Sequence, residues 1–137
     1  MVKVATGKGF ELELPKSYIT MKEDAEKTIA RLVADHPKAK RMWELLRDDP
    51  EANADWDMAN YIAVSKLGYN DHGDIHVKIV AANALKMLKL LLDNGILTSA
   101  IKERAGDEDD AHLIVLAGAL LHDIGNQVHR ESHNVSG

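Results

Sequence analysis

Residues 111–137 read AHLIVLAGALLHDIGNQVHRESHNVSG, and this stretch concentrates the chemistry of the chain. Its apolar run has the Leu, Ile and Val content of a core element, yet it ends on His122 and Asp123 and is followed by His129 and His133. Burying an ionised carboxylate beside an imidazole is unfavourable unless something pairs with the charge, and a divalent cation is an efficient partner. We therefore predict a core element that leads into the functional site.

Length and composition indicate one domain over residues 1–137, built mainly from helices. The chain is 45% hydrophobic but only 4% aromatic, so its core must come from aliphatic residues, which suits packed helices. The formal net charge of -5 argues against a nonspecific nucleic-acid binder. With no cysteine, any metal must sit on nitrogen and oxygen. No apolar run is long enough for a membrane span and no leader pattern is present, so a cytoplasmic protein is expected.

The first half of the chain predicts a short hairpin followed by accessory helices. Alternating apolar and polar residues around a glycine-containing turn predict a β-hairpin within residues 1–15. Three amphipathic helices are expected over residues 20–68, and Gly68 is placed to end the third. Thr20 and Glu23 have the spacing of a capping box, so we expect the first helix to begin there.

Two tryptophans and a run of acids have structural interpretations. Trp43 and Trp56 lie on apolar helical stripes, which predicts core positions rather than a stacking platform. A polar linker then leads into a long helix that Gly95 is placed to stop. The four acids at residues 107–110 could form a hard-cation loop, but we interpret them as the solvated start of a helix, where they complement its dipole.

The four candidate donors of the C-terminal stretch can form a metal site. Neighbouring helix residues point about 100° apart, yet short side chains such as His122 and Asp123 can converge on an ion beside the helix. His129 and His133 are four residues apart, which places two imidazoles on one face if the segment is helical. Imidazole and carboxylate donors suit Fe, Mn, Co, Ni, Zn or Mg, so a divalent metal cofactor is expected.

The pattern of these motifs resembles the HD-domain metal-dependent phosphohydrolases. Residues 76–81 read HVKIVA and match the family's H-x-x-x-V-A pattern, and residues 120–125 read LLHDIG and match its central motif. Residues 133–137 read HNVSG and resemble an H-E-x-x-G-like element with Asn for Glu. The resemblance implies an all-α, HD-domain-like bundle of about six helices, in which residues 69–137 form the metal-binding core without the family's final helix.

The same resemblance implies roles for individual residues. His76, His122 and Asp123 would bind a divalent metal, and Asp123 would also be catalytic by orienting the attacking water or bridging a second ion. His133 and His129 would bind that second ion or a phosphate oxygen. Without the resemblance, His76 on its long helix would be interpreted as a hydrogen-bonded core residue.

Two further residues are candidates for contact with a small phosphorylated ligand. Arg130 could clamp a phosphate, because a guanidinium matches two of its oxygens, although a solvated arginine fits the sequence equally well. His72 could line the mouth of the pocket or cap the linker. The sequence leaves a homodimer open.

Two departures from the family pattern affect the prediction. Asn126 follows the central motif where many relatives have lysine or glutamate, so a charged group is absent there. No aspartate follows Asp123, although the family's last ligand is one. Either the chain is a fragment, or the shell is completed by water, by a partner chain, or by an acid such as Asp71 or Glu131.

These observations favour an enzyme that hydrolyses phosphate esters of a nucleotide or another small phosphorylated metabolite. The main alternative is a non-catalytic HD-type module that keeps the metal and senses a phosphorylated ligand. A third hypothesis is a helical interaction protein whose histidines cluster without function.

Overall fold

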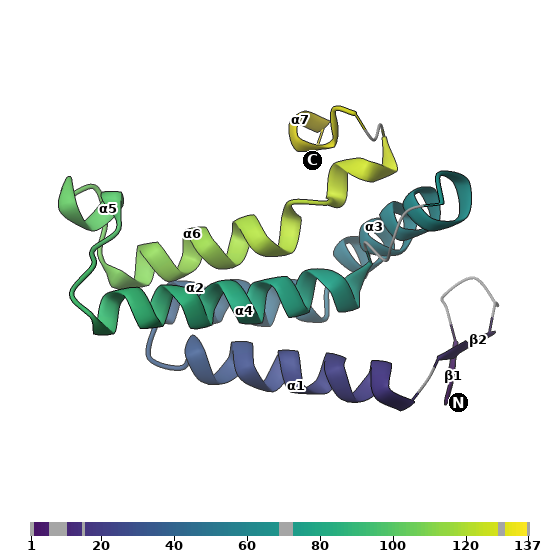
Figure 1. Ribbon diagram of the computed structural model, residues 1–137, viewed down its shortest axis with the longest axis horizontal. Helices are drawn as coiled ribbons and strands as arrows, with labels where there is room; N and C mark the ends of the chain where they lie inside the picture. Colours follow the sequence, from purple (N-terminus) through teal and green to yellow (C-terminus); the bar gives the residue numbers. More distant parts are fainter. Residues whose placement is uncertain (1, 6–10, 15, 69–72, 129–130, 137) are drawn as a thin grey trace.

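The computed structural model describes residues 2–5, 11–14, 16–68, 73–128 and 131–136, and within them the protein is predominantly helical (Figure 1). The predicted all-α class is confirmed. The helices are α1 (Lys16–Leu32), α2 (Pro37–Arg47), α3 (Pro50–Asn60), α4 (Asp74–Asp93), α5 (Ser99–Lys102), α6 (Glu108–Leu121) and α7 (His133–Ser136). A π-helical segment, η1 (Tyr61–Lys66), continues α3, and a 3₁₀ segment, η2 (Ile124–Gln127), follows α6.

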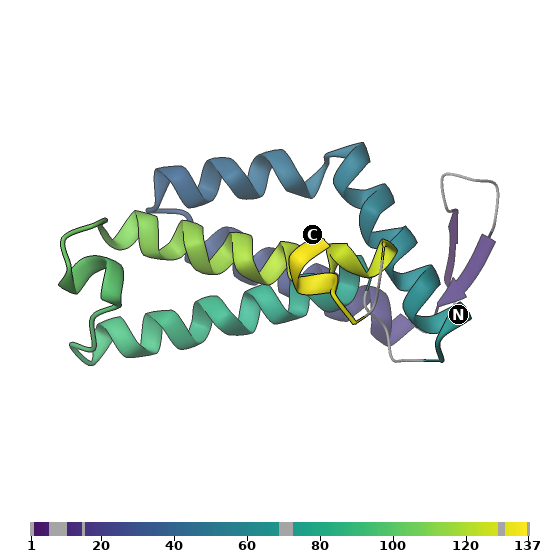
Figure 2. The same cartoon turned by 90° about the horizontal axis from the view of Figure 1, so that it is seen from above.

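Helix α4 lies at the centre of the bundle because two helices pack along it. Helix α1 packs on one side of α4 and α6 on another, while α2 covers α6 (Figure 2). The core between them is aliphatic apart from Trp43 and Trp56, which are 2% and 0% exposed, so both are core residues as predicted. The buried aliphatic residues with zero exposure include Ile29, Val33, Val77, Leu85, Leu116 and Leu120.

Two glycines end helices as the sequence predicts. Gly68 follows η1 with φ +70° and Gly95 follows α4 with φ +73°, a left-handed backbone that glycine adopts without steric cost. The start of α1 differs from the prediction, because the helix begins at Lys16 and not at Thr20. Nothing in the residues between them breaks a helix, so the spacing of Thr20 and Glu23 does not mark its start.

The acids at residues 107–110 start α6 and also hold α2. Asp107 is the N-cap and forms a reciprocal capping box with Asp110, as expected for a helix start. Asp109 does more than the sequence predicted, because its carboxylate accepts hydrogen bonds from the backbone N–H groups of Lys38 and Ala39 at 2.9 to 3.1 Å. The first turn of α2 is therefore fixed to the first turn of α6.

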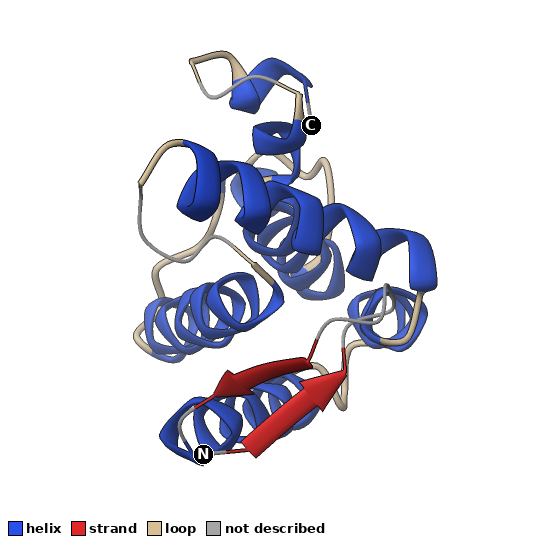
Figure 3. Cartoon of the chain, turned by 90° about the vertical axis from the view of Figure 1, so that its right-hand side faces the viewer, coloured by secondary structure: helices blue, strands red, loops and turns tan. Residues whose placement is uncertain are grey.

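The N-terminal strands lie at one end of the molecule, beyond the start of α1 (Figure 1), and they are in front of the helices when this end faces the viewer (Figure 3). Strands β1 (Val2–Ala5) and β2 (Glu11–Leu14) pair antiparallel, with Val2 opposite Leu14. The turn between them is outside the described residues. In the described part of the chain, no helix combines the length and apolar character needed to cross a membrane.

Candidate metal centre

The site is built where α6 ends. The last carbonyls of a helix have no partner within it, and two of those in α6 are used to organise the site. His122 continues the helical backbone, and its Nδ1 lies 2.8 Å from the carbonyl oxygen of Ala119. The indole N–H of Trp56 donates to the carbonyl oxygen of Leu120 at 2.9 Å. The end of α6 is thus tied to α3.

The contact of His122 with Ala119 determines which ring nitrogen faces the site. A carbonyl oxygen only accepts hydrogen bonds, so Nδ1 must carry the proton in this contact. In the neutral ring, Nε2 then has a free lone pair. That nitrogen lies 3.0 Å from Oδ2 of Asp123, so Nε2 of His122 is directed into the site.

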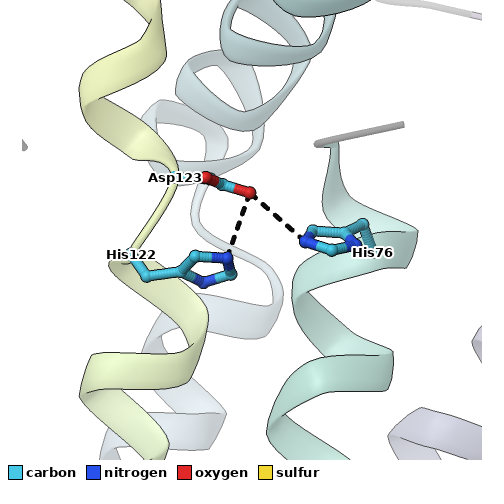
Figure 4. Close-up of side chains that lie close together, drawn as sticks. All are labelled: His76, His122 and Asp123. Carbon is cyan, nitrogen blue, oxygen red and sulfur yellow. Dashed lines mark ion pairs between the residues drawn. The ribbon is translucent and has the colours of Figure 1, made fainter. Parts of the chain in front are cut away.

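His76 approaches the same carboxylate oxygen from α4. Its Nε2 lies 3.2 Å from Oδ2 of Asp123, and the His76 and His122 rings are 5.5 Å apart and tilted by 54° (Figure 4). One donor atom from each of the three residues lies within 4.8 Å of the other two. Two imidazoles from different helices therefore converge with one carboxylate, as the sequence predicted for these three residues.

The other oxygen of Asp123 has different neighbours. Asn126 donates its side-chain N–H to Oδ1 at 3.0 Å, and Nε2 of His133 lies 3.7 Å from the same atom. The carboxylate therefore faces the imidazole pair with Oδ2, and faces Asn126 and His133 with Oδ1. His133 lies at the site, but beside the three-residue group rather than within it.

Burial of the site is uneven. The side chain of Asp123 is 3% exposed, whereas those of His76 and His122 are 32% and 37% exposed. A buried anion is unfavourable without a positive partner. The Asp123 carboxylate therefore lies on the buried side of the group, and the two imidazoles lie on the side that is partly open to solvent.

Several predicted residues are not placed at this centre. His129, Arg130, His72 and Asp71 lie outside the described residues. Glu131 is exposed and is not in the three-residue group, so it does not complete the group in place of the missing aspartate.

Two contacts at this site could not be predicted from the sequence patterns considered above. Asn126 was interpreted as the absence of a charged group, but it is 1% exposed and contacts Asp123 directly. Trp56 was assigned to the core, and its hydrogen bond to the end of α6 was not foreseen. A buried tryptophan needs a partner for its N–H, and this is the signal that could have prompted a search for one.

A second charged cluster lies on another face of α4. Lys78 is 1% exposed, and its ammonium lies 2.8 Å from the Glu26 carboxylate and 3.3 Å from that of Asp74. Lys22 adds a further contact to Asp74 at 2.6 Å. The Lys78 ammonium also lies 5.8 Å from the ring of Trp56. We call these four charged residues, Lys22, Glu26, Asp74 and Lys78, the lysine cluster.

Comparison with known proteins finds a relative that is described as uncharacterized. The chain is 48% identical over 96 residues to a Methanocaldococcus jannaschii protein described as uncharacterized protein MJ1020. The match covers 70% of this chain and 37% of that protein, so the chain spans well under half of the relative's length. No family model matches, and no solved structure matches.

Proposed function

We propose that this protein is a divalent-metal-dependent phosphohydrolase of the HD-domain type, acting on the phosphate ester of a nucleotide or another small phosphorylated metabolite. The observation that carries the proposal is the convergence of His76 from α4 with His122 and Asp123 from the end of α6. The residues come from the two motifs that resemble the family.

The donor set fits a divalent cation better than it fits a structural ion pair. Oδ2 of Asp123 faces two imidazole nitrogens, and Nε2 of His122 carries a lone pair when its Nδ1 donates to Ala119. Two such nitrogens and one carboxylate oxygen are suitable ligands for Fe, Mn, Co, Ni or Zn. A cation at this position would lie between one carboxylate oxygen and two imidazole nitrogens, and it would pair with the buried charge of Asp123.

Each residue has a defined task in this proposal. A divalent cation, when bound, lowers the pKa of a coordinated water and offsets negative charge on the phosphoryl oxygens. Asp123 and the two imidazoles would hold the cation, and the buried Asp123 carboxylate would also orient the attacking water. His133, beside Oδ1 of Asp123, is placed to contact a second ion or a phosphate oxygen. Arg130 and His72 remain candidates for substrate contact.

Metal analysis and a hydrolysis screen test the proposal directly. Protein purified without chelators should contain a transition metal, and protein reloaded with Mn, Fe, Co, Ni or Zn should hydrolyse at least one phosphomonoester, phosphodiester or nucleotide. Asp123→Asn and His122→Ala should lose both metal and activity, because each removes a donor atom from the group.

A second histidine on α6 provides a matched control. His112 is 4% exposed, and its Nδ1 lies 2.7 Å from the carbonyl oxygen of Glu108, a contact similar to that of His122 but near the start of the helix. His112→Gln should therefore keep metal and turnover. Metal binding without turnover on any of these substrates would contradict the enzyme hypothesis and favour a sensing module. Absence of metal from the wild-type protein would contradict both hypotheses.

A further inference from the structure

We infer that Asn126 is a positioning residue, whose buried side-chain amide fixes the Asp123 carboxylate so that Oδ2 faces the His76 and His122 imidazoles. This inference rests on the proposed metal centre. Asn126 does not belong to the three-residue group, and the role inferred for it is exerted through its hydrogen bond to Asp123.

Asn126 is tied to Asp123 twice across one tight turn. Its backbone N–H donates to the carbonyl oxygen of Asp123 at 3.0 Å, and its side-chain N–H donates to Oδ1, also at 3.0 Å. The 3₁₀ segment η2 produces this arrangement, because residues three apart lie one above the other in such a turn. The amide is 1% exposed, so water does not compete freely for the contact.

The carboxylate needs such a partner to hold its orientation. The terminal torsion of an aspartate is broad, so sterics alone do not fix the plane of the carboxylate. A hydrogen bond to Oδ1 removes that freedom and leaves Oδ2 towards the imidazole nitrogens at 3.0 and 3.2 Å. Outer partners of this kind orient the ligands of metal sites and increase metal affinity.

The side-chain amide of Asn126 is uncharged, and for cation binding this matters as much as its N–H donor. A lysine at residue 126 would also donate to Oδ1, but its positive charge would compensate the carboxylate and reduce the attraction for a cation. A glutamate would repel Asp123. An asparagine donates to one oxygen without adding a charge beside Asp123, so the departure from the family pattern at Asn126 is compatible with the metal centre.

The test compares two substitutions that differ in whether water can replace the amide. Asn126→Leu keeps the branched arrangement of heavy atoms but has no donor, whereas Asn126→Ala leaves room for a water that can donate to Oδ1. We expect the dissociation constant for Co²⁺ or Mn²⁺ to rise about 100-fold in Asn126→Leu and about 10-fold in Asn126→Ala. The visible absorption spectrum of the Co²⁺ form should change in both variants, because the geometry of the donor group changes.

Asn94 gives the matched control. Its side-chain N–H donates to the carbonyl oxygen of Leu90 at 2.7 Å, at the end of α4 opposite to His76. Asn94→Ala removes one amide hydrogen bond and should leave both the dissociation constant and the Co²⁺ spectrum unchanged. Thermal unfolding of the metal-free variants measures any general loss of stability separately.

The outcomes separate this inference from the proposed function. Unchanged metal affinity and an unchanged Co²⁺ spectrum in both Asn126 variants would overturn the positioning role, while hydrolysis by the wild-type protein would still stand. Weaker binding in the two variants, in the expected order, would support the role even if the wild-type protein hydrolysed no phosphate ester. Failure of the wild-type protein to bind any divalent metal would overturn both.

Discussion

The lysine cluster and the candidate metal centre lie on different faces of α4, and both contain carboxylates. The groups that surround these carboxylates differ in charge. In the lysine cluster, two ammonium groups meet two carboxylates, and every charge has a partner of opposite sign. At the candidate metal centre, Asp123 meets two imidazoles and an amide, none of which carries a fixed charge. His76 and Lys78 are two residues apart on α4, which directs them about 200° apart around the helix.

The difference shows how to distinguish a structural charge cluster from a candidate cation site. Burial alone would raise the pKa of Asp74, but the hydrogen bond from Lys22 and the charges of Lys78 and Lys22 outweigh it and hold that pKa below its usual value. The lysine cluster thus contains its own cations. At the candidate metal centre, the carboxylate lies instead among imidazole nitrogens, which are donor atoms that a metal ion can share.

The largest expected effect on stability is in the lysine cluster. Lys78→Met should lower the free energy of unfolding by about 3 kcal/mol, because it leaves two partly buried carboxylates short of a cation. Urea denaturation of the metal-free protein measures this loss. Metal affinity should not change, because Lys78 points away from His76.

An exposed lysine serves as the control for this substitution. Lys38 also forms a close ion pair, at 2.6 Å from Asp110, but its side chain is 50% exposed. Lys38→Met should change stability little, because solvent screens the pair. Equal losses in the two variants would contradict the distinction between buried and exposed lysines.

Adding a divalent metal should raise the free energy of unfolding by slightly less than the loss expected for Lys78→Met. At a free metal concentration of 100 times the dissociation constant, the gain is about 2.7 kcal/mol, which corresponds to a rise of roughly 8 °C in Tm. Differential scanning fluorimetry with and without chelator measures the rise. It should persist in Lys78→Met and disappear in Asp123→Asn, and a rise that remains in Asp123→Asn would place the metal outside the candidate centre.

Removing the indole N–H of Trp56 should change the free energy of unfolding by less than adding a metal does. Trp56→Phe keeps an aromatic ring beside Lys78 but leaves the carbonyl of Leu120 without its donor, and the free energy of unfolding should fall by about 1 kcal/mol. Metal affinity should also weaken, because this bond fixes the helix end that carries His122. Chemical denaturation and metal titration of the same variant test the two effects, and unchanged metal affinity would limit Trp56 to the core.

The smallest effect is a pH dependence in the lysine cluster. Because the folded pKa of Asp74 lies below its ordinary value of 3.8, the unfolded chain binds the proton more readily. The stabilisation is therefore fully present above about pH 5 and is lost as the pH falls through the folded pKa. The difference in unfolding free energy between wild type and Asp74→Asn should shrink below pH 4, and a constant difference would exclude Asp74 as its source.

Local rules predicted the helices, and the resemblance of two motifs predicted the centre of the site. Helix ends at Gly68 and Gly95 follow from backbone preferences, and the convergence of His76 with His122 and Asp123 was expected from the resemblance of their two motifs. The roles of Trp56, Asn126 and the lysine cluster depend on which helices meet, and nothing in the spacing of single residues specifies that. The start of α1 was misplaced because a capping-box pattern also occurs inside helices.

Helix α6 is attached to neighbouring helices at both of its ends. Asp109 anchors its first turn to the backbone of α2, and the carbonyl of Leu120 anchors its last turn to Trp56 of α3. Sliding α6 along its axis by one residue, about 1.5 Å, would break both attachments together. These contacts oppose axial movement of α6, so we expect changes in the geometry of the candidate metal centre to arise in α4 or in the chain beyond Asp123.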